Sequence, residues 1–429
     1  MRYDIAVVGA GPAGLAAAAR ASAAGRRVVL LDAGPLPGGQ YWRHRAGFAP
    51  ADRRFRALAG TLDRVDYRSG APVWFAEPGF TLHTGAGEIS AGRLVLATGA
   101  HDRVVPFPGW DLPGVTTAGG AQALLKGHGV LAGRRIVVAG TGPFLLPVAT
   151  GLARAGARIA GVFEAAPALR MIRRRIPLDK LTEAAGYAAR FARHRIPYRT
   201  GHRLLAAHGD GEVDAVTVAG RNGVPRRIRC DALAVGYGFT PALELPTLLD
   251  CAVRVDGDTN LVVTVDHAQQ TTVAGVFAAG EITGVGGADL ALVEGAIAGA
   301  AAAGSAVPDR LAKRRAGLRR FAAALRETYR VPPGWPDGLA EDTLVCRCEE
   351  VSYGAIRTAV TELRATEART VKLLTRAGMG WCQGRICGYP VACLAARLGG
   401  RAVTESDLDA FARRPIAMPI TLGELAGDS

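Results

Sequence analysis

The chain starts with a run of apolar residues that ends abruptly in glycine. Residues 5–8 read Ile-Ala-Val-Val, and a continuous apolar run of this length is typical of a parallel strand covered on both faces. An alanine-rich stretch follows to about Ala24. After Gly25, residues 27–31 read as a second strand, with Arg27 followed by four apolar residues. The pattern predicts a strand, a helix and a second strand as the first unit of a parallel α/β sheet.

The same pattern returns in the middle of the chain. Residues 135–139 form a buried-strand pattern before glycine, with Arg135 followed by four apolar residues. A helical stretch follows, and a further strand ends at Glu164. Two more strands are predicted over residues 93–97 and 276–279, and all of these residues except Arg93 are apolar. Two β-α-β units in one chain predict an α/β fold with two Rossmann-like parts, one inserted into the other.

The later part of the chain changes to helices and proline-rich connections. Residues 307–341 begin with a basic amphipathic helix and end in a linker that contains several prolines. Further helices are predicted around residues 353–366, 389–398 and 406–413, and residues 415–419 are predicted to be extended. This part lies outside the two β-α-β units. Its pattern predicts a small helical domain that is followed by a tail.

The composition fits a globular protein of several domains. The chain has 429 residues, of which 49% are hydrophobic and 21% are charged, and these proportions exclude a wholly disordered chain. Arginine supplies most of the positive charge, and the net charge is +14. The basic clusters at residues 173–175 and 313–320 are interpreted as solvated helix faces, with a docking face for an acidic partner or for phosphates as the alternative. No nucleic-acid-binding module is recognisable, and no nucleic-acid partner is expected.

Hydropathy and the positions of the cysteines indicate in which cellular compartment the protein is expected. No run of about 18 apolar residues appears, so no membrane span is expected, and the first strand begins too early to leave room for a signal peptide. The seven cysteines are odd in number and gather late in the chain. This pattern favours a cytoplasmic protein with a metal site over a secreted disulfide framework. A peripheral position at the inner face of a membrane stays open as an alternative.

The first glycine motif has the context of a dinucleotide-binding fingerprint. Gly9 permits the tight turn after the strand, Gly11 lets backbone amides approach a pyrophosphate, and Gly14 lets the helix pack closely on the strand. The N-terminus of that helix favours anionic phosphates. Asp32 ends the second strand, where an acid can bind a ribose hydroxyl. These features together predict that a dinucleotide binds here.

Three segments, taken in order, resemble the FAD-binding segments of flavoproteins with two dinucleotide-binding domains. They are the first fingerprint, the Ala-Thr-Gly segment that ends at Gly99, and the strand that ends in Gly280 and Glu281. In that class the late acid contacts the ribityl chain of the flavin, and here it is Glu281 where aspartate is usual. The loop at residues 38–40 is similar to the loop near the flavin. The resemblance implies an FAD site lined by Gly9, Gly11, Pro12, Ala13, Gly14, Asp32, Gly39, Gln40, Thr98, Gly99, Gly280 and Glu281.

The second fingerprint departs from the first. Leu145 stands where the third glycine is expected, so looser packing between helix and strand is predicted. Glu164 would bind a ribose 2′-hydroxyl and repel a 2′-phosphate, which favours NAD over NADP. Gly140, Gly142 and Glu164 are therefore candidates for a second nucleotide site, and a retained fold with an empty site is the alternative.

Four cysteines predict a metal centre in the C-terminal part. One residue separates Cys346 from Cys348, and four residues separate Cys382 from Cys387. Four thiolates can ligate a 2Fe-2S cluster or a zinc ion, but this spacing fits the paired knuckles of zinc sites poorly. A 2Fe-2S cluster on these four cysteines is the prediction, and zinc is the alternative. The glycines that would let backbone amides approach the sulfur atoms are Gly378, Gly380, Gly384 and Gly388.

Other residues near these motifs receive no chemical role. Cys230, Cys251 and Cys393 are isolated and are interpreted as small buried residues. No C-x-x-C pair stands near the FAD segments, so a disulfide-reductase mechanism is not expected. His101 and Asp102 follow the Ala-Thr-Gly segment, and the histidine is interpreted as a surface loop residue without a catalytic role.

The cysteine-containing segments, residues 345–350 and 376–387, resemble the domain of bacterioferritin-associated ferredoxin. They are more similar still to that domain as it is fused to the flavoprotein α-subunits of heteromeric amine and amino-acid dehydrogenases. That family includes the opine oxidase A subunit, the hydrogen cyanide synthase B subunit and D-hydroxyproline dehydrogenase α-subunits. Residues 114–122, 236–241 and 284–295 also look like the family, so the resemblance spans nearly the whole chain.

The resemblance implies an oxidoreductase with a division of labour between subunits. A partner β-subunit, similar to glycine or sarcosine oxidase and with its own FAD, would oxidise the C–N bond of an amino acid, imino acid or opine. This chain would carry FAD and the 2Fe-2S cluster and pass electrons to an acceptor. A small third subunit, a bound NAD and a flavin mononucleotide at the subunit junction are features that the resemblance leaves open.

The expected fold is that of a two-dinucleotide-binding-domain flavoprotein with a small helical 2Fe-2S domain. The FAD-binding domain is discontinuous and has a Rossmann-like domain inserted in it. The predicted domains are an FAD-binding domain at 1–102 and 231–306, an NAD(P)-like Rossmann domain at 103–230, a linker helix at 307–341, a cluster domain at 342–398 and a tail at 399–429.

Two other functions stay open. The second fingerprint would suit a self-sufficient NADH-dependent flavoprotein reductase that passes electrons through the cluster to a partner redox protein. The cluster domain would also suit a docking or sensing module with no enzymatic activity.

Overall fold

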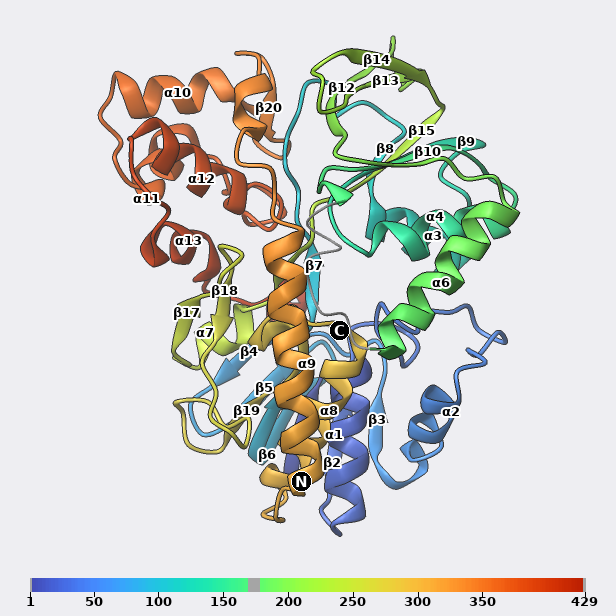
Figure 1. The fold of residues 1–429 in the computed structure, drawn as a ribbon. Coiled ribbons are helices and arrows are strands. Elements are labelled where there is room, and N and C mark those ends of the chain that lie inside the picture. The colour runs from blue at the N-terminus through green and yellow to red at the C-terminus, as the bar shows by residue number, and fades with distance from the viewer. Residues whose placement is uncertain (1, 169–177, 427–429) are drawn as a thin grey trace. The chain divides into compact units, whose positions relative to one another are not determined.

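The computed structural model describes residues 2–168 and 178–426 (Figure 1), so the basic cluster at residues 173–175 lies outside the described part. Contacts divide the chain into two compact units. The first unit comprises Met1–Ala100, Thr240–Ala323 and Ala412–Ser429, and the second comprises His101–Phe239 and Ala324–Phe411. The predicted domain boundaries divide the chain more finely than this and stay a prediction.

A seven-stranded sheet forms the centre of the first unit. Its strand order is β3-β2-β1-β6-β5-β4, and β19 pairs with β6. The strands are Tyr3–Val8 (β1), Val28–Leu31 (β2), Asp66–Arg68 (β3), Val73–Glu77 (β4), Thr81–Thr84 (β5), Gly87–Leu96 (β6) and Val276–Ala278 (β19). β1 runs parallel to β2 and β6, with Val8 opposite Leu31 and Leu96, and Ala278 of β19 is also opposite Leu96. Parallel pairing therefore brings the carboxyl ends of four strands to one edge, and the predicted FAD segments follow those ends.

Two helices built from small residues pack directly against each other in this unit. They are α1 (Pro12–Ala23) and α8 (Ala288–Ala302). A Cβ added to Gly295 would lie 2.0 Å from the carbonyl oxygen of Ala13, and one added to Gly299 would lie 2.2 Å from that of Ala17. The two helix backbones are in contact, which a larger residue at either glycine would prevent.

The substitution Gly295→Ala is expected to destabilise the first unit, because its methyl group would overlap the Ala13 carbonyl. Overpacking of this kind costs about 1–3 kcal/mol or more, so we expect a lower melting temperature by circular dichroism and weaker FAD retention. Gly317→Ala is the matched control, since Gly317 lies in α9 (Asp309–Thr328) and a Cβ there meets no atom within 4 Å. Alanine in this helix should raise stability by up to about 1 kcal/mol. Equal melting temperatures for the two variants would contradict the close helix packing.

The rest of the first unit surrounds this sheet and helix pair. The tail belongs to it, since the amide of Ala417 donates to the carbonyl of Trp74 at 2.7 Å and Arg414 pairs with Glu244. Its other elements are α2 (Arg53–Ala59), η1 (Leu62–Arg64), α7 (Glu244–Leu248), β17 (Val253–Val255), β18 (Leu261–Val263), η2 (Gly280–Thr283) and α14 (Leu422–Ala426). The segments β7 (Ala100–Asp102) and β16 (Phe239–Pro241) stand at the boundaries between the units.

A parallel five-stranded sheet forms the Rossmann-like part of the second unit. Its order is β11-β10-β9-β15-β8, with β9 parallel to both β10 and β15. The strands are Val115–Thr117 (β8), Arg135–Gly140 (β9), Arg158–Glu164 (β10), Tyr198–Thr200 (β11) and Ala232–Gly236 (β15). The helices of this part are α3 (Ala118–His128), α4 (Leu145–Arg154) and α6 (Leu178–Arg193). A three-stranded antiparallel sheet accompanies it, made of β12 (Arg203–His208), β13 (Ala215–Ala219) and β14 (Pro225–Arg229).

The cysteine-containing part consists of a short hairpin and four short helices (Figure 1). These are β20 (Leu344–Cys346), β21 (Val351–Ser352), α10 (Tyr353–Thr361), α11 (Ala368–Thr375), α12 (Gly388–Leu398) and α13 (Glu405–Ala412), and the short η3 (Trp335–Gly338) precedes them. The helices predicted around residues 353–366, 389–398 and 406–413 are confirmed, although the first ends at Thr361. Helix α11 was not predicted. No helix of the described ranges is long and apolar enough to cross a membrane.

The basic cluster at residues 313–320 is solvated only in part. Lys313 and Arg320 are exposed, as predicted. Arg315 and Arg319 lie one helical turn apart on α9 and donate hydrogen bonds to other residues of the first unit. The interpretation as a solvated helix face is therefore wrong for these two arginines, because charge alone does not reveal which face of a helix packs.

Candidate functional site

The glycine loop between β1 and α1 has the geometry that its sequence predicts. Gly9 has a φ of +102°, and a Cβ there would lie 2.3 Å from the carbonyl oxygen of Ala97. A Cβ on Gly14 would lie 1.6 Å from the carbonyl oxygen of Gly9, whereas a Cβ on Gly11 would meet no described atom within 4 Å. The absence of a side chain at Gly9 and Gly14 thus lets the loop and helix α1 pack closely against the neighbouring backbone. The space in front of Gly11 fits a pyrophosphate.

Asp32 fastens this loop to the end of β2. Its carboxylate accepts hydrogen bonds from the backbone amide of Ala10 and, at 2.6 Å, from that of Gly34. Burial raises the pKa of Asp32, and the two backbone donors oppose that shift. The carboxylate therefore holds the loop in shape, and its contact with a ribose hydroxyl stays a prediction.

The other predicted FAD residues follow the neighbouring strands. The hydroxyl of Thr98 donates to a backbone carbonyl at 2.8 Å, and Gly99 has a φ of +75°. Gly39 lies against the glycine loop, since a Cβ there would be 2.9 Å from the Cα of Gly11. Gln40 is exposed. The predicted segments thus follow strand ends at one edge of the sheet, beside the free space in front of Gly11, which is an arrangement that fits FAD.

Glu281 follows β19 at this edge and lies in η2. Its Oε1 accepts a hydrogen bond from the amide of Gly287 at 2.9 Å. Burial, together with the nearby Glu294, raises the pKa of Glu281 to about 7. A ribityl hydroxyl can donate a hydrogen bond to this carboxyl group whether or not the group is ionised, so the residue fits its predicted contact.

Glu294 is a residue of this site that the sequence analysis missed. It is 0% exposed, and its Oε2 accepts hydrogen bonds from the amide of Gly280 at 3.1 Å and the hydroxyl of Thr283 at 2.9 Å. Its Oε1 lies 2.6 Å from Nη2 of Arg319. Burial raises the pKa of Glu294, and Arg319 opposes the shift. An acid in the middle of the otherwise apolar α8 is the signal that could have revealed it.

The second fingerprint repeats the geometry of the first. Gly140 has a φ of +133°, and a Cβ on Gly142 would meet no described atom within 4 Å. Glu164 is 1% exposed and accepts hydrogen bonds from the amide of Gly142 at 2.9 Å and that of Ala166 at 2.8 Å. Burial raises the pKa of Glu164 to about 7, and these donors oppose the shift. The loop has kept the form of a nucleotide site, and nucleotide binding there stays a prediction.

Leu145 stands in place of the third glycine and is buried at the start of α4. A Cβ on Gly236 would lie 3.0 Å from its Cδ2. The third glycine of a fingerprint usually lets the helix pack closely on the strand. Here Gly236 of β15 provides the space for the Leu145 side chain instead. Gly236 is distant in sequence, and this role was not predicted.

His101 and Asp102 have structural contacts in the second unit. His101 is half-buried in β7, and its Nε2 lies 3.0 Å from the carbonyl oxygen of Arg385, between the second pair of cysteines. The interpretation of His101 as a surface loop residue is wrong, because the cysteine-containing loop packs over it. Asp102 accepts a hydrogen bond from the hydroxyl of Thr117 at 2.6 Å, beside the start of α3.

The four predicted cluster cysteines form a continuous row of contacting thiols. Cys387 lies close enough to Cys346 and Cys382, and Cys382 close enough to Cys348, for each thiol to shift the pKa of its neighbour. A 2Fe-2S cluster needs two thiolates at each of two irons, and the row offers four neighbouring thiols.

Backbone amides favour the thiolate form of two of these cysteines. Donors to Cys346 and Cys382 are the amides of Cys348, Glu349, Gly378, Gly384 and Ile386. The hydrogen bond with Cys387 and these donors lower the pKa of Cys346 to about 6 and that of Cys382 to about 5. Thiolate is the form that binds iron, and amide donors around sulfur are typical of cluster sites. The residues present therefore fit a 2Fe-2S cluster.

The other cysteines differ from these four. Cys230 and Cys251 are buried, as predicted, and Cys393 is half-buried. Burial raises the pKa of Cys230 and of Cys393 to about 11. These thiols stay protonated at neutral pH and make poor metal ligands.

Phe411 of α13 is a second residue that the sequence analysis missed. A Cβ on Gly378, Gly384 or Gly388 would lie 2.7 Å, 2.9 Å or 2.8 Å from a side-chain atom of Phe411. A Cβ on Gly380 would instead lie 2.4 Å from the Cβ of a cluster cysteine. Three of the four glycines thus pack around one aromatic ring, and no motif marks Phe411 because it is distant in sequence.

The substitution Phe411→Ala is expected to loosen the cysteine-containing loop, because it removes the ring on which three glycines pack. A change of this size in a core costs about 3–5 kcal/mol. We expect faster iron loss to a chelator, followed by absorbance, with FAD content unchanged. Phe48→Ala is the control, since Phe48 is 64% exposed. Iron loss at the parental rate would contradict a supporting role for Phe411.

Comparison with known proteins agrees with this geometry. The family model described as pyridine nucleotide-disulphide oxidoreductase matches residues 3–305, and the model described as BFD-like 2Fe-2S binding domain matches residues 344–396. The opine oxidase A subunit of Agrobacterium tumefaciens (strain Ach5) is 33% identical over 470 residues, covering 99% of this chain and 91% of that protein. Hydrogen cyanide synthase subunit HcnB of Pseudomonas aeruginosa is 34% identical over 426 residues, covering 89% of this chain and 90% of that protein.

A solved structure supports the fold of the whole chain. L-proline dehydrogenase from P. horikoshii superposes with a TM-score of 0.72 at 22% identity, covering 99% of this chain and 79% of that chain. The family matches bear out the predicted cofactors, FAD and a 2Fe-2S cluster, and the predicted flavoprotein fold. The chain therefore belongs to the pyridine nucleotide-disulphide oxidoreductase family, in common with the opine oxidase A subunit, and it is an FAD-dependent oxidoreductase subunit with a C-terminal BFD-like 2Fe-2S domain.

Proposed function

We propose that this chain is the electron-transferring subunit of a heteromeric dehydrogenase or oxidase that acts on the C–N bond of an amino acid, imino acid or opine. The observation that carries the proposal is the joining of two redox sites in one chain. His101, which contacts the cysteine-containing loop, follows Gly99 of the predicted flavin segment by only two residues in the sequence. Relatives named as subunits of opine oxidase and hydrogen cyanide synthase support a heteromer.

The residues of this chain bind and orient the two redox groups. When bound, the flavin exchanges electrons in pairs and the cluster exchanges them singly. The amides beyond Gly11 and the carboxyl of Glu281 would hold the flavin nucleotide, and the four cysteines would hold the irons. The imidazole of His101 braces the carbonyl of Arg385, which fixes the loop between Cys382 and Cys387.

The substrate would be oxidised on a separate partner protein that has its own FAD and is similar to glycine or sarcosine oxidase. Trp381 supports a partner contact, since it directly precedes Cys382 and is 80% exposed. An exposed tryptophan is unusual on a free surface and common at the centre of interfaces. A small third subunit and a cytoplasmic location belong to the same proposal.

Expression of this chain alone and together with a candidate flavoprotein partner tests the division of labour. The chain alone should contain FAD, iron and sulfide and should show negligible amino-acid or opine dehydrogenase activity with an artificial acceptor. Co-expression with the partner should give a stable complex and restore that activity. Full activity of the chain alone would overturn the proposal.

A self-sufficient NADH-dependent reductase is the second candidate. The open space at Gly142 and the buried Glu164 beside it favour a working nucleotide site. Anaerobic mixing with NADH should bleach the flavin within seconds if this function is correct, and NADPH should act far more slowly because Glu164 repels a 2′-phosphate. A flavin that stays oxidised in NADH would remove this candidate. A docking module without enzymatic activity is not retained, since the family is one of oxidoreductases.

A further inference from the structure

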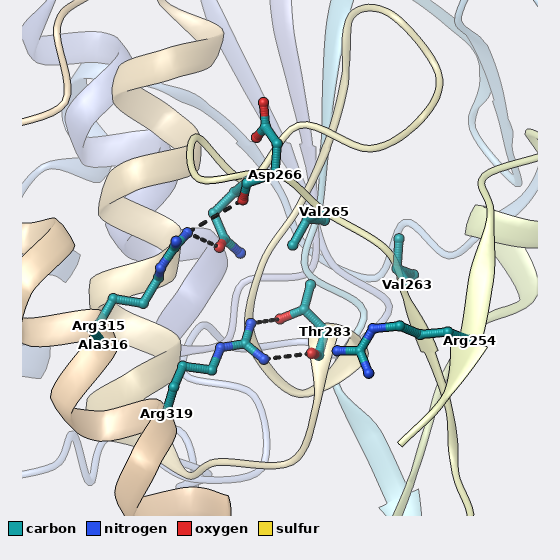
Figure 2. Close-up of a pocket in the computed structure, with 9 residues that line it drawn as sticks. Arg254, Val263, Val265, Asp266, Thr283, Arg315, Ala316 and Arg319 are labelled. Carbon is teal, nitrogen blue, oxygen red and sulfur yellow. Dashed lines mark hydrogen bonds between the residues drawn. The ribbon is translucent and has the colours of Figure 1, made fainter. Parts of the chain in front are cut away.

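A pocket of about 290 Å³ lies within the first unit, between the β17–β18 hairpin, the loop that follows it, η2 and α9 (Figure 2). Three arginines reach it, namely Arg254 of β17 and Arg315 and Arg319 of α9. Val263 and Val265 form an apolar part of its wall. None of the predicted FAD residues lines this pocket. It adjoins the predicted FAD site through Thr283 and Arg319, which both bond to Glu294.

Buried acceptors hold the two arginines of α9 in fixed positions. Nη1 of Arg315 donates to Oε1 of Gln269 at 2.8 Å, and Gln269 is itself 0% exposed and donates to the carbonyl of Ala278 at 2.8 Å. Nη1 and Nη2 of Arg319 donate to the carbonyl and hydroxyl of Thr283 at 2.7 Å and 2.9 Å. Donors fixed in this way lose little conformational entropy when a ligand binds.

Three arginines and one carboxylate, that of Asp266, line the pocket. Behind the lining, Glu294 pairs with Arg319 and also attracts Arg315, and Glu281 attracts Arg319. The carboxylate of Asp266 accepts hydrogen bonds from two backbone amides, those of Ala268 and Gln270, at 2.8 Å and 2.9 Å. Within the described part of the chain, no carboxylate forms an ion pair with Arg254 or Arg315. Figure 2 shows the guanidinium of Arg254 directed toward Thr283 and Arg319. Like charges that converge on one cavity create a site for an anion.

We propose that this pocket binds a phosphate group, either as inorganic phosphate or as a small phosphate monoester. Guanidinium groups enter from a strand on one side and from a helix on the other. A tetrahedral dianion accepts hydrogen bonds from several directions, whereas a carboxylate accepts them mainly in one plane. The volume of about 290 Å³ is many times the roughly 10–15 Å³ that a single water molecule needs, so it holds a phosphate with part of an organic group against the two valines.

Calorimetric titration of the full-length protein with FAD and cluster in place tests this site. The ligands are inorganic phosphate, glycerol 3-phosphate, and succinate as a dicarboxylate of equal charge. We expect saturable phosphate binding that Arg254→Gln weakens at least tenfold. Arg226→Gln in β14 is the matched control, since Arg226 is an exposed strand arginine of the other unit, and it should leave the affinity unchanged. Both variants should keep the parental FAD and iron content, so the readout does not depend on enzymatic activity.

The remaining outcomes decide the source of the phosphate or reject the site. Tighter binding of glycerol 3-phosphate than of inorganic phosphate would identify a monoester as the ligand, and equal or weaker binding would identify the free ion. Binding of neither phosphate, equal affinity for succinate, or an affinity that Arg254→Gln leaves unchanged would each overturn the proposal.

Discussion

Cys387→Ser is expected to abolish the 2Fe-2S cluster and with it electron transfer out of the chain. Cys387 is buried, and its thiol lies close enough to Cys346 and Cys382 to shift the pKa of both, so it is one of the two inner members of the row of thiols. A serine hydroxyl is not ionised at neutral pH and is a poor substitute for a thiolate ligand. Substitution of residues that only hydrogen-bond to metal ligands lowers metal affinity or activity by about 10- to 100-fold. Loss of a ligand itself should therefore lower the rate of electron transfer by more than about 100-fold.

The measurements are iron and sulfide content, the EPR signal of the reduced protein, and the rate at which the reconstituted complex reduces its acceptor. FAD content should stay at the parental level, because the glycine edge lies in the other unit. Cys393→Ser is the matched control, since Cys393 lies on the same helix, α12, and its thiol has a pKa of about 11 because of burial. A Cys387→Ser protein that keeps its iron and its acceptor rate would refute the assignment of the ligand.

Gly11→Ala is expected to remove FAD while the protein still folds. Gly11 has φ −73° and ψ −175°, which alanine adopts freely, and a Cβ there would meet no described atom within 4 Å. The added methyl group would occupy the space that fits the pyrophosphate. Overlap with a ligand of this kind costs about 1–3 kcal/mol, which corresponds to a loss in FAD affinity of about 5- to 150-fold at 1.4 kcal/mol per factor of ten.

Gly14→Ala separates this effect from a general loss of folding. A Cβ on Gly14 would lie 1.6 Å from the carbonyl oxygen of Gly9, so this variant should lose both FAD and thermal stability. Gly11→Ala should keep the melting temperature of the FAD-free parent protein, measured by circular dichroism, and lose only affinity, measured by fluorescence titration with FAD. Retention of the parental affinity by Gly11→Ala would show that the pyrophosphate lies elsewhere.

The main features of the fold could be predicted from the sequence because they depend on short segments. An apolar run followed by Gly-x-Gly predicts a buried parallel strand and a phosphate-facing turn, since both are set by neighbouring residues. The spacing of the four cysteines is equally local, because ligands one or four residues apart must lie close together wherever the chain goes. The domain boundaries and the cofactor contacts of individual residues stay predictions.

Residues that act through distant partners were missed. Glu294 matters because helix α8 places it beside Gly280 and Arg319, and Phe411 matters because α13 returns to the cysteine-containing loop. His101 was assigned to a surface loop because nothing nearby in the sequence indicates that the loop of Arg385 covers it. Arg315 and Arg319 were interpreted as solvated for the same reason.

The sequence by itself determined the two nucleotide-type folds, the four-cysteine motif and the class of oxidoreductase, because each is encoded in contiguous residues with fixed spacing. Only the tertiary structure decided which charges are buried, which glycines pack against an aromatic ring and where three arginines meet in one pocket. Burial and charge balance arise from contacts between residues that lie far apart in the chain, and their free energies depend on the distances that folding sets.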